Sequence, residues 1–290
     1  MIASRRTMLA ALAAGALTGC DRPGSLASGG RVASAAAAGR QAPGTIPSAV
    51  PPAAPVLTRA QVVARYSHLR PRTWGFGGPG VVRDLHTSRR VIALTFDACG
   101  GPGGSGYDQA LIGFLRRREV PATLFLNSRW IDANPAAFGQ LAAEPLFEIA
   151  NHGTRHLPLS VTGRSAYGIP GTRNAGEVYD EIATNQAKLR LLLGVPPRFF
   201  RAGTAYCDDV AARIVTAMGD RLVSFSVNGD GGATFTPGQV RSVVTAAPGG
   251  SIVICHMNHP ESGTAQGIAA SVPYLLACGY RFVRLSDEVR

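Results

Sequence analysis

Short apolar runs alternate with longer segments of helical periodicity from residue 91 to the end of the chain. The runs are rich in Val, Ile, Leu and Phe, which are typical of buried strands. They cover residues 91–96, 122–126, 147–150, 198–200, 222–227, 251–255 and 281–285. Strands that alternate with helices form parallel sheets, so the pattern predicts an α/β fold with about seven parallel strands. We expect this sheet to be closed, or nearly closed, into a (β/α) barrel.

Two of the intervening helices have clear boundaries. Residues 177–193 place apolar side chains at helical spacing, and Gly194 follows where the helix should end. The apolar face consists of Val178, Ile182, Leu189 and Leu192. A second helix should begin at Thr236, because a threonine cap followed by Pro237 at the first helical position is a typical start.

The first 20 residues have the pattern of an export signal. Arg5 and Arg6 precede an apolar stretch that is too short for a permanent membrane helix, and LTGC follows at Cys20. This resembles a twin-arginine signal followed by a bacterial lipobox, which predicts a lipid anchor on Cys20 and attachment to a membrane. The alternative is an ordinary secretory signal in which Cys20 has no role. Both interpretations predict export, to the periplasm or the cell surface.

The next segments lead to the main domain. Residues 21–55 are rich in Gly, Ala, Ser and Pro and contain almost no large apolar side chains. Such a segment buries too little surface to offset its ordering entropy, so it should be a flexible linker. Residues 56–90 contain a short helix-like segment and should form an N-terminal extension packed on a main domain over residues 91–290.

The composition fits a globular protein with a flexible arm. Of the 290 residues, 46% are hydrophobic, and the formal net charge is +11. This charge favours anionic surfaces such as cell-wall polymers or lipid headgroups. No basic run is interleaved with aromatic residues, so we do not expect nucleic-acid binding. Nothing in the sequence indicates an oligomeric state.

Chemically active side chains follow several of the predicted strands. They are Asp97, His152, His156, Arg201 and His256. Because loops at the carboxyl ends of parallel strands converge on one crevice, these side chains should meet around one mouth. A carboxylate, imidazoles and a guanidinium in one crevice predict a metal-assisted hydrolase.

The spacing of these residues indicates separate roles. His152 and His156 are four residues apart, which places two imidazoles on one side of a turn, as half of a zinc-type site. Asp97 ends a strand before a glycine-rich loop, where it could bind the metal, serve as a general base, or cap the loop. His256 belongs to a residue type that titrates near neutral pH, so it could protonate a leaving group.

Five segments occur in a familiar order: TFDACGG, NHGTRHLPLS, RFFRAGTAYCDD, FSVNGDGG and IVICHMNHP. Together they resemble the motifs of the polysaccharide deacetylase family, the NodB homology domain of carbohydrate esterase family 4. The resemblance covers about residues 91–290. It implies a distorted (β/α) barrel that removes acetyl groups from N-acetylated sugars in chitin, peptidoglycan or exopolysaccharide.

The resemblance also implies a role for each matching residue. Asp97 matches the catalytic base, and His152 and His156 match the two metal-binding imidazoles. His256 matches the acid that protonates the departing amine. Arg201 matches the arginine that orients the base.

Two looser motifs supply groups for the substrate and the oxyanion. In RFFRAGTAYCDD, the backbone N–H of Thr204 falls at the family's oxyanion donor. In FSVNGDGG, either Asp230 or Asn228 stands for the acidic partner of the arginine.

The first motif departs from the family's usual TFDDG, because Ala98 replaces the second Asp, which is the third metal ligand. Three substitutes are open: Asp97 itself, a Cys99 thiolate, or a water or more distant carboxylate such as Asp108. Asp97 is favoured because the strand end aims it inward, whereas Cys99 has another use. The expected ligands are therefore the two histidines and Asp97. The expected metal is zinc, with cobalt or nickel as alternatives.

That other use is a disulfide. Cys99, Cys207 and Cys255 all lie in motif segments, and loops gathered at one mouth can bring such residues together. An exported protein meets an oxidising compartment, in which a Cys99–Cys207 bridge would persist. The alternative is that all three are buried free thiols.

The resemblance thus predicts an N-deacetylase, a hydrolase of carbon–nitrogen bonds other than peptide bonds. Its partner would be an N-acetylated polysaccharide of the envelope or the extracellular space. Two rivals remain open. Ala98 also fits a catalytically inactive, carbohydrate-binding envelope lipoprotein, and the same metal chemistry could deacetylate a carbohydrate ester.

Overall fold

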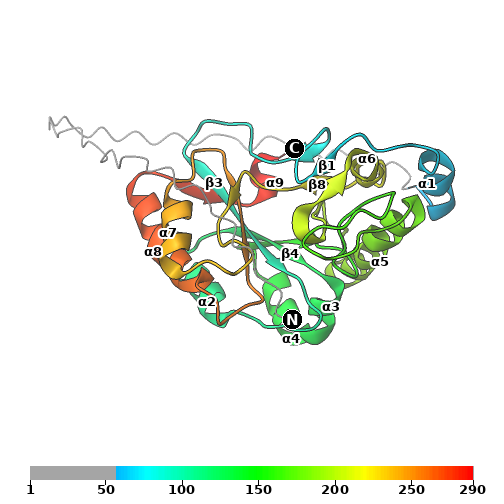
Figure 1. Ribbon diagram of the computed structural model, residues 1–290. Helices are drawn as coiled ribbons and strands as arrows, with labels where there is room; N and C mark the ends of the chain where they lie inside the picture. The colour runs from blue at the N-terminus through cyan, green and yellow to red at the C-terminus, as the bar shows by residue number, and fades with distance from the viewer. Residues whose placement is uncertain (1–56, 290) are drawn as a thin grey trace, which may run out of the picture. The chain divides into compact units, whose positions relative to one another are not determined.

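The computed structural model describes residues 57–289, which belong to one compact unit (Figure 1). The predicted export signal with Cys20 and the predicted linker over residues 21–55 lie outside the described residues and stay predictions. Within residues 57–289, no helix combines the length and apolar content needed to cross a bilayer.

A parallel sheet of nine strands forms the centre of the described part. Its order is β2-β8-β6-β5-β4-β3-β10-β9, and β11 also pairs with β3. The strands are β2 (Val81–Val82), β3 (Val91–Ala98), β4 (Ala122–Leu126), β5 (Phe147–Asn151), β6 (Phe199–Phe200), β8 (Arg221–Val223), β9 (Val227–Asn228), β10 (Ile252–His256) and β11 (Arg281–Val283). The parallel α/β prediction is confirmed, since each predicted apolar run contains a strand.

The sheet curls into a half-barrel. The predicted strand at 222–227 is divided: β8 pairs with β6, whereas β9 pairs with β10. Residues 221–228 therefore run from one side of the curled sheet to the other. Outside this sheet, β1 (Trp74–Gly75) pairs antiparallel with β7 (Cys207–Asp208).

Helices surround the curled sheet. They are α1 (Arg59–Tyr66), α2 (Gln109–Arg117), α3 (Ser128–Ala133), α4 (Pro135–Ala142), α5 (Ala175–Leu193), α6 (Asp209–Ala217), α7 (Pro237–Thr245), α8 (Thr264–Ala277) and α9 (Leu285–Glu288), with a short 3₁₀ turn, η1 (Gly203–Ala205). Figure 1 shows α7 and α8 on one side of the strands and α1, α5 and α6 on the other.

The two predicted helix boundaries are confirmed. Helix α5 ends at Gly194, whose φ of 77° is the left-handed conformation that favours glycine. Helix α7 begins after Thr236, whose side chain accepts the Gln239 N–H in a capping box. The predicted apolar face of α5 is wrong at its end, because Leu192 is 50% exposed.

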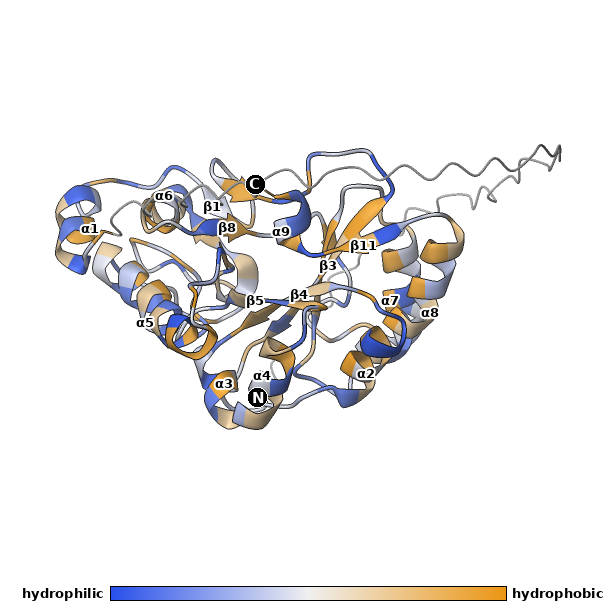
Figure 2. Ribbon diagram, turned by 180° about the vertical axis from the view of Figure 1, so that it is seen from behind, coloured by the Kyte–Doolittle hydropathy of each residue, from blue (hydrophilic) through white to orange (hydrophobic). Residues whose placement is uncertain are grey.

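Strand β3 separates two cores. All eight of its residues are buried, and alternate side chains face opposite sides of a strand. The even-numbered residues from Ile92 to Ala98 belong to the core between the sheet and helices α2, α4, α7 and α8. Val91 and Ala93 belong to the inner core of the half-barrel. Figure 2 shows the hydrophobic colouring of the sheet strands, β3 among them, and the mixed colouring of the surrounding helices.

Residues 57–90 pack closely on the rest of the unit. Val62 and Tyr66 of α1 share a core with α5 and α6. Arg59 adds an exposed ion pair with Asp180, at 2.9 Å. Further along, β2 joins the sheet by pairing with β8.

Candidate active site

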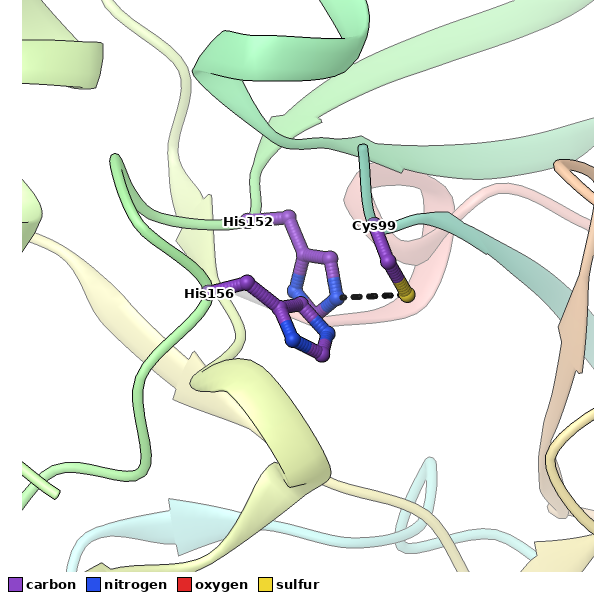
Figure 3. A group of neighbouring side chains, drawn as sticks. All are labelled: Cys99, His152 and His156. Atoms are coloured by element: carbon purple, nitrogen blue, oxygen red, sulfur yellow. Dashed lines mark hydrogen bonds between the residues drawn. The ribbon is translucent and has the colours of Figure 1, made fainter. Parts of the chain in front are cut away.

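Two imidazoles and a thiol gather at the carboxyl ends of β3 and β5. The ligand atoms of Cys99, His152 and His156 all lie within 4.8 Å of one another. Figure 3 shows the three side chains pointing toward one another from two different loops. The two histidines of the predicted metal site are therefore brought together. Two imidazole nitrogens and a thiolate form a donor set that fits a zinc-type cation.

The third member of this cluster is Cys99 and not Asp97. One oxygen of Asp97, Oδ2, lies 3.5 Å from Nε2 of His152. The other, Oδ1, accepts a 2.6 Å hydrogen bond from Nη1 of Arg201. The alternative ligand Asp108 instead caps α2, where its carboxylate accepts the Leu111 N–H at 2.9 Å.

His152 is oriented by the backbone. Its Nδ1 lies 2.9 Å from the carbonyl oxygen of Arg201, and because a carbonyl only accepts, Nδ1 carries the proton. Nε2 is then left to face Cys99 and Asp97, as expected for a metal-binding imidazole held by a second hydrogen bond. Burial lowers the pKa of His152, but the nearby Asp97 and Cys99 raise it above its ordinary value overall.

Glu181 of α5 holds the loop that carries both histidines, and the sequence pattern did not reveal it. Its buried carboxylate accepts backbone N–H bonds from Thr154, Arg155 and Leu157, at 3.0 to 3.1 Å. A Cβ at Gly153 would lie 2.5 Å from Oε1 of Glu181, so the loop needs glycine there. The one available signal was a carboxylate three residues after Val178, on the buried face of the helix.

Buried amides complete the support of the histidine loop, and they too were missed. Nδ2 of Asn127 donates to the carbonyl oxygens of His152 and Gly153, both at 2.9 Å. Oδ1 of Asn151 accepts the Gly153 N–H and Nδ2 of Asn185, both at 2.8 Å. The backbone around His152 therefore has little freedom to move.

Arg201 follows β6 and reaches across the half-barrel to Asp97. It is fully buried and also donates to Oγ1 of Thr95 and to the Ser224 carbonyl, at 3.0 and 2.8 Å. Its guanidinium carbon lies 4.0 Å from the centre of the Phe125 ring. Burial lowers the pKa of Arg201 and the Asp97 charge opposes this, but an arginine stays protonated at neutral pH.

Asp230 pairs with His256, which corrects its predicted pairing with Arg201. Oδ1 of Asp230 lies 3.0 Å from Nδ1 of His256, and Oδ2 accepts the His256 N–H at 2.6 Å. Thr264 donates to the same Oδ2 at 3.0 Å. The other candidate, Asn228, accepts the Gly231 N–H at 3.0 Å. Asp230 lies in the loop after β9, and β9 pairs with β10, which ends at His256. Local sequence patterns do not reveal a contact between segments that are distant along the chain.

This pairing shifts both groups toward their charged forms. Burial opposes the charged imidazole, but the Asp230 carboxylate and its hydrogen bond raise the pKa of His256 well above its ordinary value. Burial also disfavours the Asp230 carboxylate, but the charge of His256 lowers the pKa of Asp230 overall. The pair therefore favours the protonated form of His256.

Thr204 lies in the turn η1, beside the histidine loop. Its φ of 66° is unusual for threonine. The preceding residue, Gly203, touches the His156 backbone so closely that a Cβ there would lie 2.3 Å from it. The structure thus brings Thr204 next to the cluster, and the role of its N–H as an oxyanion donor stays a prediction.

The predicted Cys99–Cys207 disulfide is wrong, because both residues are free thiols. Sγ of Cys99 faces His152, with 3.9 Å between Sγ and Nε2. Cys207 is instead buried in β7, in the core of α1, α5 and α6, and burial raises its pKa to about 12. For Cys99, burial raises the pKa, but the His156 charge and hydrogen bonds from the imidazoles lower it well below its ordinary value.

A pocket of about 700 Å³ opens above these groups. Its lining includes Cys99, His156, His256, Arg129 and Arg155. The proposed acid and the metal-type cluster therefore face one cavity, and two arginines make part of its rim basic. Such a cavity has the size and polarity of a site for part of a sugar chain.

Comparisons with known proteins agree with this arrangement. The polysaccharide deacetylase family model matches residues 84–223. An uncharacterised protein of Streptomyces coelicolor is 33% identical over 203 residues, which are 68% of this chain and 71% of that protein. The peptidoglycan-N-acetylglucosamine deacetylase of Bacillus cereus is 27% identical over 214 residues, 72% of this chain and 93% of that enzyme.

The fold is also similar to that of solved structures. A pseudoenzyme of carbohydrate esterase family 4 from Bacillus anthracis has a TM-score of 0.61 and 19% identity, covering 74% of this chain and 70% of that one. A solved peptidoglycan N-acetylglucosamine deacetylase has the same TM-score of 0.61 with 20% identity, covering 72% of this chain and 92% of that one, so the fold is similar to that of a deacetylase and of a pseudoenzyme.

Proposed function

Because the chain belongs to the polysaccharide deacetylase family, we propose that it is a metal-dependent hydrolase that removes N-acetyl groups from an envelope polysaccharide. One observation carries the proposal. A carboxylate held by Arg201 lies 3.5 Å from His152, and an imidazole held by Asp230 lines the same pocket as His156. Amide hydrolysis needs both a proton acceptor for water and a proton donor for the amine.

The residues divide the reaction between them. A divalent cation bound at His152 and His156 would supply Lewis acidity to the acetyl carbonyl and to the attacking water. Asp97 accepts a proton from that water, and the hydrogen bond from Arg201 orients its carboxylate. The Thr204 N–H stabilises the oxyanion. His256 then donates its proton to nitrogen as the C–N bond breaks, which releases acetate and a free amine.

Peptidoglycan is the substrate that we propose first. The similarity to the Bacillus cereus peptidoglycan deacetylase supports it, and so does the net charge of +11, which favours anionic wall polymers. An exported chain anchored at Cys20 through the linker of residues 21–55 would reach the wall from a membrane.

Two observations favour a second candidate, an inactive carbohydrate-binding protein. Ala98 stands where the family has a ligand carboxylate, and the fold resembles a pseudoenzyme. A deacetylase of carbohydrate esters is the third candidate.

Acetate release separates these functions. Peptidoglycan, chitooligosaccharide and acetylated xylan should be incubated side by side with the zinc-loaded protein and with the chelator-treated protein. We expect release from peptidoglycan that chelator abolishes and zinc restores. Release from acetylated xylan alone would favour the ester enzyme. Absence of release from all three, together with retained binding of the polymer, would overturn the enzymatic proposal.

A further inference from the structure

We propose that the Cys99 thiolate is the third protein ligand of the metal, so that this chain binds its cation through two nitrogens and one sulfur. The proposal rests on the proposed function only in requiring a cation at the histidine pair. It deepens that function, because it says which side chain replaces the carboxylate that Ala98 lacks.

The register of β3 keeps Ala98 away from the pocket. The strand pairing extends to its last residue, where Ala98 pairs with Leu126, and the Asn127 N–H bonds the Ala98 carbonyl at 3.0 Å. The Ala98 side chain is fully buried in the core between the sheet and the helices. Asp97 faces the other way, and Cys99 is the next position on that side.

The spacing of the donor atoms suits a small tetrahedral site. Zn–S and Zn–N bonds at a tetrahedral angle place sulfur and nitrogen about 3.6 Å apart. Sγ of Cys99 lies 3.9 Å from Nε2 of His152. A shift of a few tenths of an ångström would therefore bring both atoms to ligand distance, and Cys99 is at the start of a glycine-rich loop that can make it.

Sulfur ligation also leaves Asp97 for one task. Its Oδ1 is occupied by Arg201, which keeps the carboxylate on the inner wall of the half-barrel. A carboxylate that both bound the metal and accepted the proton from water would be a weaker base. With Cys99 as a ligand, the base and the metal site are separate groups.

The other buried thiols do not compete for this role. Neither Cys207 nor Cys255 belongs to the cluster of possible metal ligands found among the described residues. A soft thiolate favours zinc or cobalt over magnesium, calcium or manganese. The chain should therefore prefer the thiophilic cations.

Cobalt(II) spectroscopy of the full chain tests the ligand directly. A thiolate bound to cobalt gives an intense sulfur-to-metal charge-transfer band in the near ultraviolet, whereas nitrogen and oxygen ligands do not. We expect this band in the unaltered chain and in Cys207→Ala, the matched control. It should be absent in Cys99→Ser and in Cys99→Asp, which offers an oxygen ligand. Zinc affinity, measured by chelator competition, should fall at least about tenfold in Cys99→Ser.

The outcomes separate this proposal from the proposed function. Stoichiometric cobalt without the band in the unaltered chain, or a band that persists in Cys99→Ser, overturns sulfur ligation while acetate release still supports the deacetylase. Failure of the unaltered chain to bind cobalt or zinc overturns both. Weak but measurable cobalt binding by Cys99→Asp without the band supports sulfur ligation, because the site is then intact apart from the sulfur.

Discussion

Two buried carboxylates lie behind the residues that line the pocket, and each is paired with a cationic side chain of a different type. On the β3 side, Asp97 is paired with Arg201, at 2.6 Å. On the β10 side, Asp230 is paired with His256, at 3.0 Å. Arginine cannot release its proton near neutral pH, whereas histidine can.

This difference assigns opposite roles to similar pairs. Arg201 and Asp97 are both buried, and since arginine keeps its proton at neutral pH, Asp97 is the member of this pair that can exchange one. In the other pair, the carboxylate is fully buried and the His256 side chain is 16% exposed at the pocket. The partner's chemistry and its exposure, and not the carboxylate, decide which pair accepts a proton and which donates one.

Removing the group that exchanges a proton, Asp97 in one pair or His256 in the other, should lower acetate release the most. Asp97→Asn cannot accept the proton from water, and His256→Ala cannot protonate the amine. We expect each substitution to lower acetate release by about 10²- to 10⁴-fold, the usual contribution of a positioned acid or base. Initial rates at saturating polysaccharide measure this, and circular dichroism checks the fold. His86→Ala, which alters an exposed histidine, is the control. Near-parental activity in either variant would refute its assigned role.

Removing only the partner carboxylate should have a smaller effect that depends on pH. Asp230 raises the pKa of His256, so the acid stays protonated until the pH passes that raised value. In Asp230→Asn the pKa of His256 falls, so the basic limb of the rate profile should move to lower pH. Rates near pH 6 should change far less than rates near pH 8.

Asn228→Ala is the matched control for this shift, because Asn228 lies in the same loop and bonds Gly231 instead of His256. If the basic limb moved in Asn228→Ala but stayed in place in Asp230→Asn, the pairing of Asp230 with His256 would not control the acid.

Another buried carboxylate, at the opposite end of the half-barrel, sharpens the comparison because no cationic side chain within residues 57–289 pairs with it. Asp220 precedes β8, and its Oδ1 accepts only from Nε2 of Gln186, at 2.8 Å. Burial raises the pKa of Asp220 to about 7. The folded state therefore favours the protonated acid, so the contribution of Asp220 to stability is fully present at low pH and is lost as the pH rises through about 7.

Asp220→Asn should leave acetate release unchanged and increase stability only at high pH. Asparagine carries no charge to bury, so the free energy of unfolding at pH 8 should rise, by at most about 4 kcal/mol for a shift of this size. At pH 4 the two proteins should unfold alike. Urea denaturation at both values measures the difference. A variant less stable than the parent at pH 8 would contradict the expected cost of the charge.

Much of the fold and part of the site follow from local sequence signals. The apolar runs predict the parallel strands, and Gly194 and Thr236 mark helix boundaries, since each signal concerns neighbours along the chain. The same reasoning placed Asp97, both histidines and His256 at strand ends. It could not reveal Glu181, because a carboxylate that binds loop amides has the same sequence appearance as one exposed to water.

The sequence alone thus determined the α/β architecture and which residue types converge on one mouth. Only the tertiary structure decided which groups touch. The register of β3 places Ala98 in a core and Cys99 by the histidines, and the passage of one loop beside β10 pairs Asp230 with His256. Periodicity is a property of adjacent residues, whereas contacts within the site join segments as much as 104 residues apart, as in the pairing of Arg201 with Asp97.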